Sequence, residues 1–253
     1  QTRPIIKLAE ASEKFGRGED IEKFRPSGAL EIRKAGYEFD RMRKRIIRHL
    51  NQRSEMLSGI SHDLRTPLTR IKLQLALIKD MEISKKLSGD VDEMEKMLNE
   101  YLQFSKSTFS DKTETFNISE LIKSTVKKYE NVNISLDQPE KTIFNGRKNL
   151  IQRCFNNLID NALKYAKKVR VKQDKIRKTI MIIVEDDGPG IPSSEYENVF
   201  KPFYKINKGR SESKSSVGLG LSISSDIVRS HGGIIELRKS EMGGLKVMIS
   251  LPV

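Results

Sequence analysis

The sequence predicts a multidomain chain in which an all-α N-terminal part, including a dimeric four-helix bundle, is followed by an α+β sandwich. In the first half of the 253 residues, apolar side chains recur every three or four positions, which is the period of a helix. After residue 114, strand-like apolar runs alternate with helical ones. The content of 36% hydrophobic and 32% charged residues favours modest cores and long solvated helices over one large globule.

The first region, 1–52, is expected to hold two short helices around a connector that contains Gly and Pro, between Gly16 and Gly28. The chain has a net charge of +13, and its only dense basic cluster is 41–45. On a helix these side chains spread around the axis, so the cluster indicates a solvated face. Direct nucleic-acid binding is therefore not expected.

The second region, 53–113, is expected to be a helical hairpin with a break near Ser84 and Ser88-Gly89. Two helices cannot bury their apolar stripes alone, so a homodimer is expected in which two hairpins form a four-helix bundle. Packing of the hairpin on its own C-terminal region is the alternative. The stripe residues are Leu57, Ile60, Leu64, Leu68, Ile71, Leu75, Ile78, Leu87, Val91, Met94, Leu98 and Tyr101.

The third region, 114–253, has strand-like and helical runs that predict a sheet with helices on one face. Asn117, followed three residues later by Glu120, predicts the N-terminal cap of its first helix. Residues 205–217, rich in Ser, Lys and Gly, are expected to be mobile. The expected strands are 180–184, 234–237 and 245–250, and the expected helices are 118–129, 147–164 and 219–231.

Composition excludes several classes of protein. No run of about 18 apolar residues is present, so no membrane span is expected in the chain. The single cysteine, Cys154, rules out an internal disulfide. The three histidines, His49, His62 and His231, are far apart and lack metal-ligand spacing, so a zinc site is not expected.

His62 is the first candidate for chemistry. At about 100° per residue, it is turned roughly 200° from the apolar positions two residues away on either side, so it is predicted to face solvent. Asp63 is placed to accept the proton of Nδ1, and Thr66 lies one turn further on the same face. Pro67 removes the partner of the Asp63 carbonyl and allows a bend. A surface histidine beside a proline is the alternative.

Nucleotide-suited residues follow in the third region. Asn157 and Asn161 share one helix face, and their amide oxygens suit Mg²⁺ that phosphates already neutralise. Lys164, which precedes Tyr165, supplies a charge for a phosphate. Asp186 ends a strand, where a carboxylate can accept a hydrogen bond from a purine amine.

Glycines complete this pattern. Gly188 and Gly190 follow Asp186 and let a ring approach the backbone. Gly218, Leu219 and Gly220 open a helix whose free N–H groups can bind phosphates. Each motif alone has a plain structural explanation, as a solvated helix or a tight turn. Their order along the chain predicts a nucleotide site.

Together these motifs resemble the sensor histidine kinases of two-component systems, in particular the osmosensor type, over nearly the whole chain. The resemblance implies a HAMP linker at 1–52 and a dimerisation and phosphotransfer hairpin at 53–113. It also implies a Bergerat-type ATP-binding domain at 114–253. The most specific segment is 61–68, which contains His62.

The family's functional residues map onto this sequence. By resemblance, His62 is the phosphoacceptor, Asp63 is the base, and Thr66 positions water when the partner is dephosphorylated. Asn161 is the Mg²⁺ ligand of the asparagine box, and Asp186 faces adenine. The other matched residues are Asn157, Lys164 and Tyr165 as nucleotide contacts, Gly188 and Gly190 in the first glycine box, Phe200 and Phe203 in the phenylalanine box, and Gly218 and Gly220 in the second glycine box. Ser216 departs from the glycine that many relatives have.

The resemblance therefore predicts an ATP- and Mg²⁺-dependent protein-histidine kinase, with reverse phosphatase activity. Its expected partners are a second copy of the chain and the receiver domain of a response regulator. Its expected location is the cytoplasmic portion of an inner-membrane protein, anchored through a transmembrane region that this sequence lacks. An ATP-driven conformational protein or a serine kinase of the same nucleotide fold is the alternative, and a basic nucleic-acid-binding dimer is a third hypothesis.

Overall fold

The computed structural model describes residues 2–16, 18, 21, 24–78, 80–106, 112–129, 133–137, 140–206 and 218–253. Most of the segment 205–217, including Ser216, lies outside these residues, so the expectations for it stay predictions. The chain divides into two compact units, Gln1–Phe15 with Asp20–Phe109 and Gly16–Glu19 with Ser110–Val253. Each unit is described by itself.

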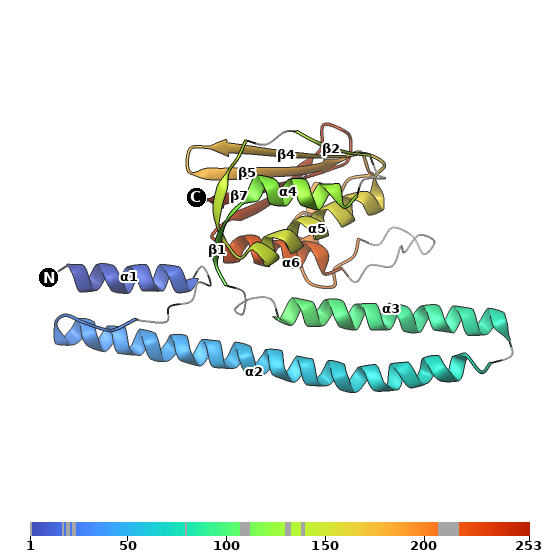
Figure 1. Cartoon of the computed structure of the whole chain (residues 1–253), viewed down its shortest axis with the longest axis horizontal. Helices are drawn as coiled ribbons and strands as arrows, with labels where there is room; N and C mark the ends of the chain where they lie inside the picture. Colours follow the sequence, from blue (N-terminus) through green and yellow to red (C-terminus); the bar gives the residue numbers. More distant parts are fainter. Residues whose placement is uncertain are drawn as a thin grey trace. The chain divides into compact units, whose positions relative to one another are not determined.

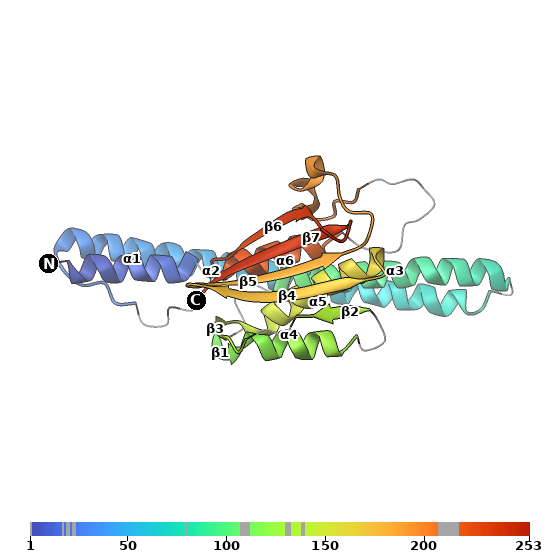
Figure 2. The same cartoon turned by 90° about the horizontal axis from the view of Figure 1, so that it is seen from above.

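Three helices form the first unit: α1 (Arg3–Gly16), α2 (Leu30–Leu75) and α3 (Met81–Lys106). α1 lies beside the beginning of α2 and runs in the same direction (Figures 1 and 2). At one end a Cβ at Gly28 would lie 2.9 Å from Pro4 Cβ. At the other end the rings of Phe15 and Phe39 pack edge to face, with centroids 6.2 Å apart.

α2 corrects the expectation of two short helices in 1–52. The second of them does not end near residue 52 but continues without a break into the hairpin helix. Residues 37–58 contain no Gly or Pro, so nothing in the sequence ends the helix there. The expected boundary between the first two regions thus falls inside one continuous helix.

The hairpin turn also differs from its expected position near 84–89. Residues 76–80 connect the two helices, and Ser84, Ser88 and Gly89 lie inside α3. Asp80 caps α3, because its Oδ1 accepts hydrogen bonds from the backbone N–H groups of Glu82 at 3.0 Å and Ile83 at 3.1 Å. A single exposed glycine inside a helix costs only about 1 kcal/mol, so Gly89 does not end it.

α2 and α3 pack antiparallel around a small apolar core. Leu68 and Leu75 of α2 and Val91 of α3 are buried together, with Leu98 packed against them. An ion pair crosses the hairpin from Lys72 Nζ to Asp92 Oδ1 at 2.7 Å and to Glu95 Oε2 at 2.5 Å. Nearer His62, Arg65 Nη2 donates to Asn99 Oδ1 at 3.2 Å.

A five-stranded sheet in the order β2-β4-β5-β7-β6 forms the second unit, together with a two-stranded sheet of β1 and β3. β2 pairs with β4 in parallel, and the other pairs are antiparallel. The strands are β1 (Glu114–Asn117), β2 (Ile134–Leu136), β3 (Ile143–Gly146), β4 (Val169–Ile176), β5 (Thr179–Asp186), β6 (Ile234–Lys239) and β7 (Leu245–Pro252).

Helices α4 (Ile118–Lys127), α5 (Lys148–Tyr165) and α6 (Gly220–Ser230) lie on one face of the large sheet (Figure 1). The α+β prediction is therefore confirmed. Alternate residues of the three central strands point into this core and are buried. They are Val169 and Val171 of β4, Ile180, Ile182 and Val184 of β5, and Val247, Ile249 and Leu251 of β7.

The three helices predicted in 114–253 agree with the structure to within two residues at each end. Asn117 caps α4 as expected, since its side chain accepts a hydrogen bond from the N–H of Ser119 at 3.1 Å. β5, β6 and β7 correspond to the three predicted strands, whereas β1 to β4 were not predicted from the sequence.

His231, which follows α6, is held in one tautomer. Its Nε2 accepts from the backbone N–H of Arg147 at 3.0 Å, so Nδ1 carries the proton and donates to the carbonyl of Ile227 at 2.7 Å. Burial lowers the pKa of His231 to about 4. The histidine therefore joins the ends of α5 and α6 as a neutral group.

Because His231 is neutral in the folded chain, the free energy of unfolding depends on pH. In the unfolded chain His231 binds a proton below about pH 6.5, whereas in the folded chain it does so only below about 4. The free energy of unfolding should therefore fall between pH 6.5 and 4, by about 2–3 kcal/mol. Urea unfolding of the full chain measures this slope, most cleanly between pH 6.5 and 5.5. His231→Gln should flatten it, and an unchanged slope would contradict this origin.

Candidate functional site

His62 lies on the solvent-facing side of α2, as predicted. Its side chain is 81% exposed and that of Asp63 is 84% exposed, with Nδ1 3.4 Å from Oδ1 of the carboxylate. Nδ1 thus faces an acceptor, and the exposed ring leaves Nε2 accessible to a second reactant. The arrangement suits a histidine that acts as a nucleophile.

The helix around His62 continues through Pro67. Proline has no N–H, so the carbonyl of Asp63 lacks its usual partner within the helix. Thr66 is exposed one turn beyond His62, and its hydroxyl lies 3.5 Å from the His62 carbonyl. Thr66 and His62 therefore share one face, as the spacing predicted.

Two rows of residues, mostly apolar, run along this part of α2. Ser61, Leu68 and Leu75, seven residues apart, are buried, and the last two belong to the hairpin core. The stripe of Ile60, Leu64 and Ile71 is 41%, 47% and 41% exposed. Ile78, Leu87 and Met94, which also belong to the predicted stripe, are exposed as well. A single chain thus leaves much of the predicted apolar surface uncovered.

Asp186 ends β5 with a carboxylate in a fixed orientation. Oδ1 accepts from the backbone N–H of Gly188 at 2.9 Å and of Leu245 at 3.2 Å. Burial raises the pKa of Asp186, and these two hydrogen bonds oppose that effect. Among the described residues the structure gives Oδ2 no partner, so this oxygen can accept a hydrogen bond from a ligand.

Gly244 is a site residue that the sequence reasoning missed. Its N–H donates to the Asp186 carbonyl at 3.1 Å. A Cβ at Gly244 would overlap Oδ1 of Asp186 and lie 2.5 Å from the nitrogen of Gly188. In the sequence the Gly243-Gly244 pair indicates only a turn before a strand. Its closeness to Asp186 arises because β7 pairs with β5.

Gly244→Ala is therefore expected to displace the Asp186 carboxylate and to weaken nucleotide binding by at least about tenfold. Calorimetric titration of the full chain with ATP measures the change. Gly243→Ala is the neighbouring control: it has open space around its Cβ but a φ of +107°, so it tests backbone strain alone. Equal affinities of Gly244→Ala and the unmodified chain would refute this positioning.

The C-terminal half of α5 carries the second group of predicted residues. Asn157 and Asn161 lie one turn apart, and Asn157 Nδ2 is buried without a hydrogen-bond partner. Lys164 Nζ lies 5.5 Å from the ring centroid of Tyr165, which is half-exposed. An unpartnered buried donor is unfavourable unless a ligand completes it, so Asn157 indicates a binding position.

Asp187 joins α5 to the Asp186 loop and was also missed. Its Oδ1 accepts from the N–H groups of Lys167 and Lys168, both at 2.8 Å, and these bonds lower its pKa. Beside it, a Cβ at Gly188 would lie 3.0 Å from the carbonyl oxygen of Tyr165. The end of α5 thus lies against the first predicted glycine turn, in which Gly190 has a φ of +66°.

The third group of predicted residues, Gly218, Leu219 and Gly220, lies at the start of α6. Leu219 is buried and anchors the turn, while a Cβ at Gly220 would meet nothing within 4 Å. Gly218 accepts from the N–H of Phe203 at 3.0 Å. α6 packs along α5, where Cys154 Sγ lies 3.9 Å from the Ser224 carbonyl. In the second unit, the structure thus places the end of α5 against the first glycine turn, and Gly218 against the backbone of Phe203 and Tyr204.

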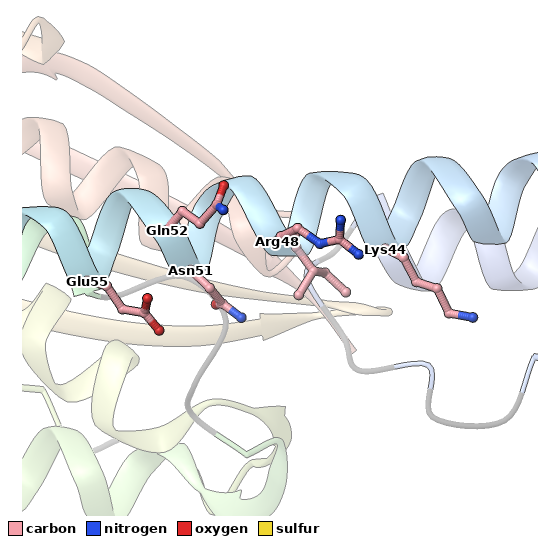
Figure 3. A pocket seen from close by; sticks show the side chains of 6 residues that line it. Lys44, Arg48, Asn51, Gln52 and Glu55 are labelled. Atoms are coloured by element: carbon pink, nitrogen blue, oxygen red, sulfur yellow. The ribbon is translucent and has the colours of Figure 1, made fainter.

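Other features do not form sites. The side chains in Figure 3 line a hollow beside α2, between Lys44 and Glu55, and all come from one helix. One helix face does not enclose a ligand, so no site is assigned there.

Among the described residues, no group of three or more His, Cys, Asp or Glu side chains is placed to hold a metal ion. In the same part of the chain, no helix has the length and apolarity to cross a bilayer.

Two family models match the chain. Residues 52–109 match the His kinase A (phospho-acceptor) domain. Residues 146–253 match the histidine kinase-, DNA gyrase B- and HSP90-like ATPase. The first match contains His62, and the second contains every nucleotide residue discussed above.

Similar proteins agree with both matches. Sensor histidine kinase GtrS of Pseudomonas aeruginosa is 33% identical over 100% of this chain and 53% of its own length. Sensor histidine kinase CpxA of Escherichia coli is 28% identical over 99% of this chain and 58% of its own. The chain thus spans about half the length of these relatives.

Solved structures share the fold. Full-length ShkA, crystallised in complex with AMPPNP, superposes with a TM-score of 0.61 at 19% identity, over 78% of this chain and 45% of its own. The histidine kinase AdeS of Acinetobacter baumannii gives a TM-score of 0.53 at 23% identity, over 76% of this chain and 97% of its own.

Proposed function

With its phosphoacceptor and ATPase domains the chain belongs to the two-component sensor histidine kinases, and we propose that it transfers the γ-phosphoryl group of ATP to His62. A response-regulator aspartate then receives this group. The observation that carries the proposal is the exposed His62 imidazole with Asp63 at its Nδ1. The same chain provides a separate unit with the nucleotide-suited residues around Asp186.

In the proposed reaction, the lone pair of His62 Nε2 forms a bond to the γ-phosphorus of ATP. The bond between that phosphorus and the bridging oxygen breaks, and its electrons leave with ADP. The imidazole becomes positively charged, and Asp63 stabilises this charge and accepts the Nδ1 proton. The product is phosphohistidine, from which the group passes to the aspartate.

The proposed ATP site combines three groups of residues: Asp186 with its loop, the C-terminal half of α5, and the turn at the start of α6. Oδ2 of Asp186 accepts a hydrogen bond from the exocyclic amine of adenine. The N–H groups at Gly218, Leu219 and Gly220 bind phosphates, where a helix N-terminus favours negative charge. Asn157, Lys164 and Tyr165 line the side formed by α5, with Phe203 beside Gly218. The complex of ShkA with AMPPNP supports this assignment.

The residues of α5 also fit Mg²⁺. The amide oxygen of Asn161 is a neutral oxygen ligand, which suits an ion whose remaining ligands come from phosphates and water. The unpartnered Asn157 amide on the same face supports this assignment. Bound there, Mg²⁺ would offset the charge of the triphosphate.

We infer that the chain is a homodimer through the uncovered apolar stripe of α2 and α3. The His kinase A match supports this assignment. Ile60, Leu64 and Ile71 would be covered by the same surface of a second hairpin, which gives a four-helix bundle around a two-fold axis. His62 points away from this stripe and stays accessible in the dimer.

The receiver domain of a response regulator is proposed to dock on the face of α2 that carries His62. Leu73 is eleven residues from His62, which returns it to nearly the same helix face. Leu73 and Leu77 are 66% and 82% exposed, so they offer apolar anchors beyond the reacting ring, with Leu73 about 16 Å further along α2.

Leu73→Glu should therefore slow phosphotransfer to the receiver domain by about tenfold or more, because it places a charge in an apolar contact. Phosphorylation of His62 itself should stay within about twofold. Both rates are measured with labelled ATP, with and without the receiver domain. A parallel fall of the two rates would contradict this docking face.

Membership of the sensor histidine kinases also suggests roles for the three regions of the chain and for Thr66. We propose that residues 1–52 form a HAMP-like linker of the osmosensor type, since α1 and the start of α2 run parallel around Phe15 and Phe39. Residues 53–113 are then the phosphotransfer hairpin, and 114–253 the ATP-binding domain. The location is the cytoplasmic portion of an inner-membrane protein. Thr66, on the face of His62, positions water for a reverse phosphatase activity.

Incubation of the chain with Mg²⁺ and ATP labelled at the γ-phosphate tests the proposed reaction. The phosphohistidine product should be lost in acid and stable in base. An acid-stable, alkali-labile label would instead indicate a serine kinase of the same nucleotide fold. ATP binding without any label would indicate a conformational ATP-binding protein.

A further inference from the structure

A network of side chains organises the segment between the Asp186 loop and α6. This segment contains two short 3-10 turns, η1 (Ser193–Glu195) and η2 (Asn198–Phe200). Glu195 Oε2 accepts hydrogen bonds from the Tyr204 hydroxyl at 2.5 Å and from Asn198 Nδ2 at 3.2 Å. Asn198 Oδ1 in turn accepts from Lys201 Nζ at 2.8 Å. Glu195 therefore ties the first turn to the residues after the second.

Phe203, next to Tyr204, has a left-handed backbone with a φ of +65°. This conformation is unfavourable for a residue with a Cβ and persists where neighbouring contacts impose it. On one side the N–H of Phe203 donates to the Gly218 carbonyl at 3.0 Å. On the other side Tyr204 is held by Glu195. These two contacts fix the backbone at Phe203.

Gly218 lies directly against this backbone. It has a φ of +78°, and a Cβ there would lie 2.9 Å from the Tyr204 carbonyl oxygen and 3.0 Å from the carbonyl carbon of Phe203. Gly218 is two residues before the first residue of α6, Gly220. A shift of Tyr204 would therefore move the N–H groups to which the phosphates are assigned.

The contact between Glu195 and Tyr204 joins a carboxylate to a phenol. The hydrogen bond from Tyr204 holds the pKa of Glu195 below its usual value, and the same bond raises the pKa of Tyr204. Near neutral pH the bond is thus charge-assisted, which makes it stronger than a bond between neutral groups.

We propose that Glu195 is a positioning residue for the phosphate end of the nucleotide, because it holds Tyr204 and thereby the Phe203 and Gly218 backbone against which α6 begins. This inference rests on the proposed ATP site. Glu195 does not touch the nucleotide in this account. It acts through Tyr204 on the groups that do, while Asp186 on the other side of the site is left unchanged.

The experiment compares ATP with adenosine, which lacks phosphates, as ligands of the full chain. Tyr204→Phe, which removes only the hydroxyl, and Glu195→Ala should each weaken ATP binding roughly tenfold. Adenosine affinity, measured by competition at millimolar concentration, should stay within about twofold. The double variant should be no weaker than Glu195→Ala alone, because that variant already removes the bond to the Tyr204 hydroxyl. Glu195→Gln keeps an acceptor and should recover part of the affinity.

Tyr196→Phe and Glu197→Ala are matched controls in the same segment and should leave both affinities unchanged. If the unmodified chain binds ATP and the Glu195 and Tyr204 variants bind it equally well, the positioning role is refuted. An equal loss of ATP and adenosine would also refute it, since it would show general damage to the fold. A failure of the unmodified chain to bind either ligand would overturn the proposed ATP site itself.

Discussion

Asp186→Asn is expected to weaken ATP binding at least about 30-fold. The Asp186 carboxylate uses Oδ1 for two backbone N–H groups, from Gly188 and Leu245. An asparagine can keep these bonds only with its single oxygen, which turns its NH₂ group toward the adenine amine. Two donors then face each other where the aspartate offered an acceptor. Calorimetric titration with ATP and with adenosine should show the same loss for both, because the defect is at the base.

Asp187→Asn is the matched control in the same loop. Its Oδ1 accepts from two backbone N–H groups, Lys167 and Lys168, and an amide oxygen can replace it there. ATP affinity should therefore change by less than about threefold. If Asp186→Asn kept its affinity to the same degree, Asp186 could not be the residue that recognises adenine.

The second large effect concerns the dimer. Leu64→Glu combined with Ile71→Glu should convert the chain from a dimer to a monomer, because it places two carboxylates in the proposed apolar interface. Neither side chain belongs to the core between α2 and α3, which Leu68, Leu75 and Val91 form, so each hairpin should remain folded. Sedimentation equilibrium measures the mass, and circular dichroism confirms the helical content.

Thr69→Glu provides the control, since Thr69 is exposed on the His62 side of α2. It should leave the dimer intact. ATP binding by the second unit should also survive in the double variant, because its site uses residues of that unit alone. A dimer that persists in the Leu64 and Ile71 variant would exclude this stripe as the interface.

Local patterns predicted much of the structure. The alternation of apolar residues in 245–250 marked β7, and Asn117 marked the start of α4, since both signals act within a few residues. The exposure of His62 followed from helix geometry, because the apolar residues around it fix which side of α2 faces inward. The candidate nucleotide residues could be proposed from the sequence because each motif is contiguous or spaced by one turn.

Features that depend on tertiary contacts were missed. Gly244 matters because β7 pairs with β5 and brings it against Asp186, which its neighbours in sequence do not reveal. The role of Asp187 likewise depends on the end of α5. The hairpin turn was wrongly placed near Ser84 to Gly89, because Asp80 caps α3 earlier and glycine alone does not stop a packed helix.

The central claim is that His62 receives the phosphoryl group of ATP. Its most direct measurement is peptide mapping of the chain after reaction with Mg²⁺ and labelled ATP, kept at alkaline pH to preserve phosphohistidine. The account predicts one labelled peptide, phosphorylated on His62, and no label in His62→Gln although this variant still binds ATP. A label that persists in His62→Gln, or that maps to another residue of the unmodified chain, would contradict it.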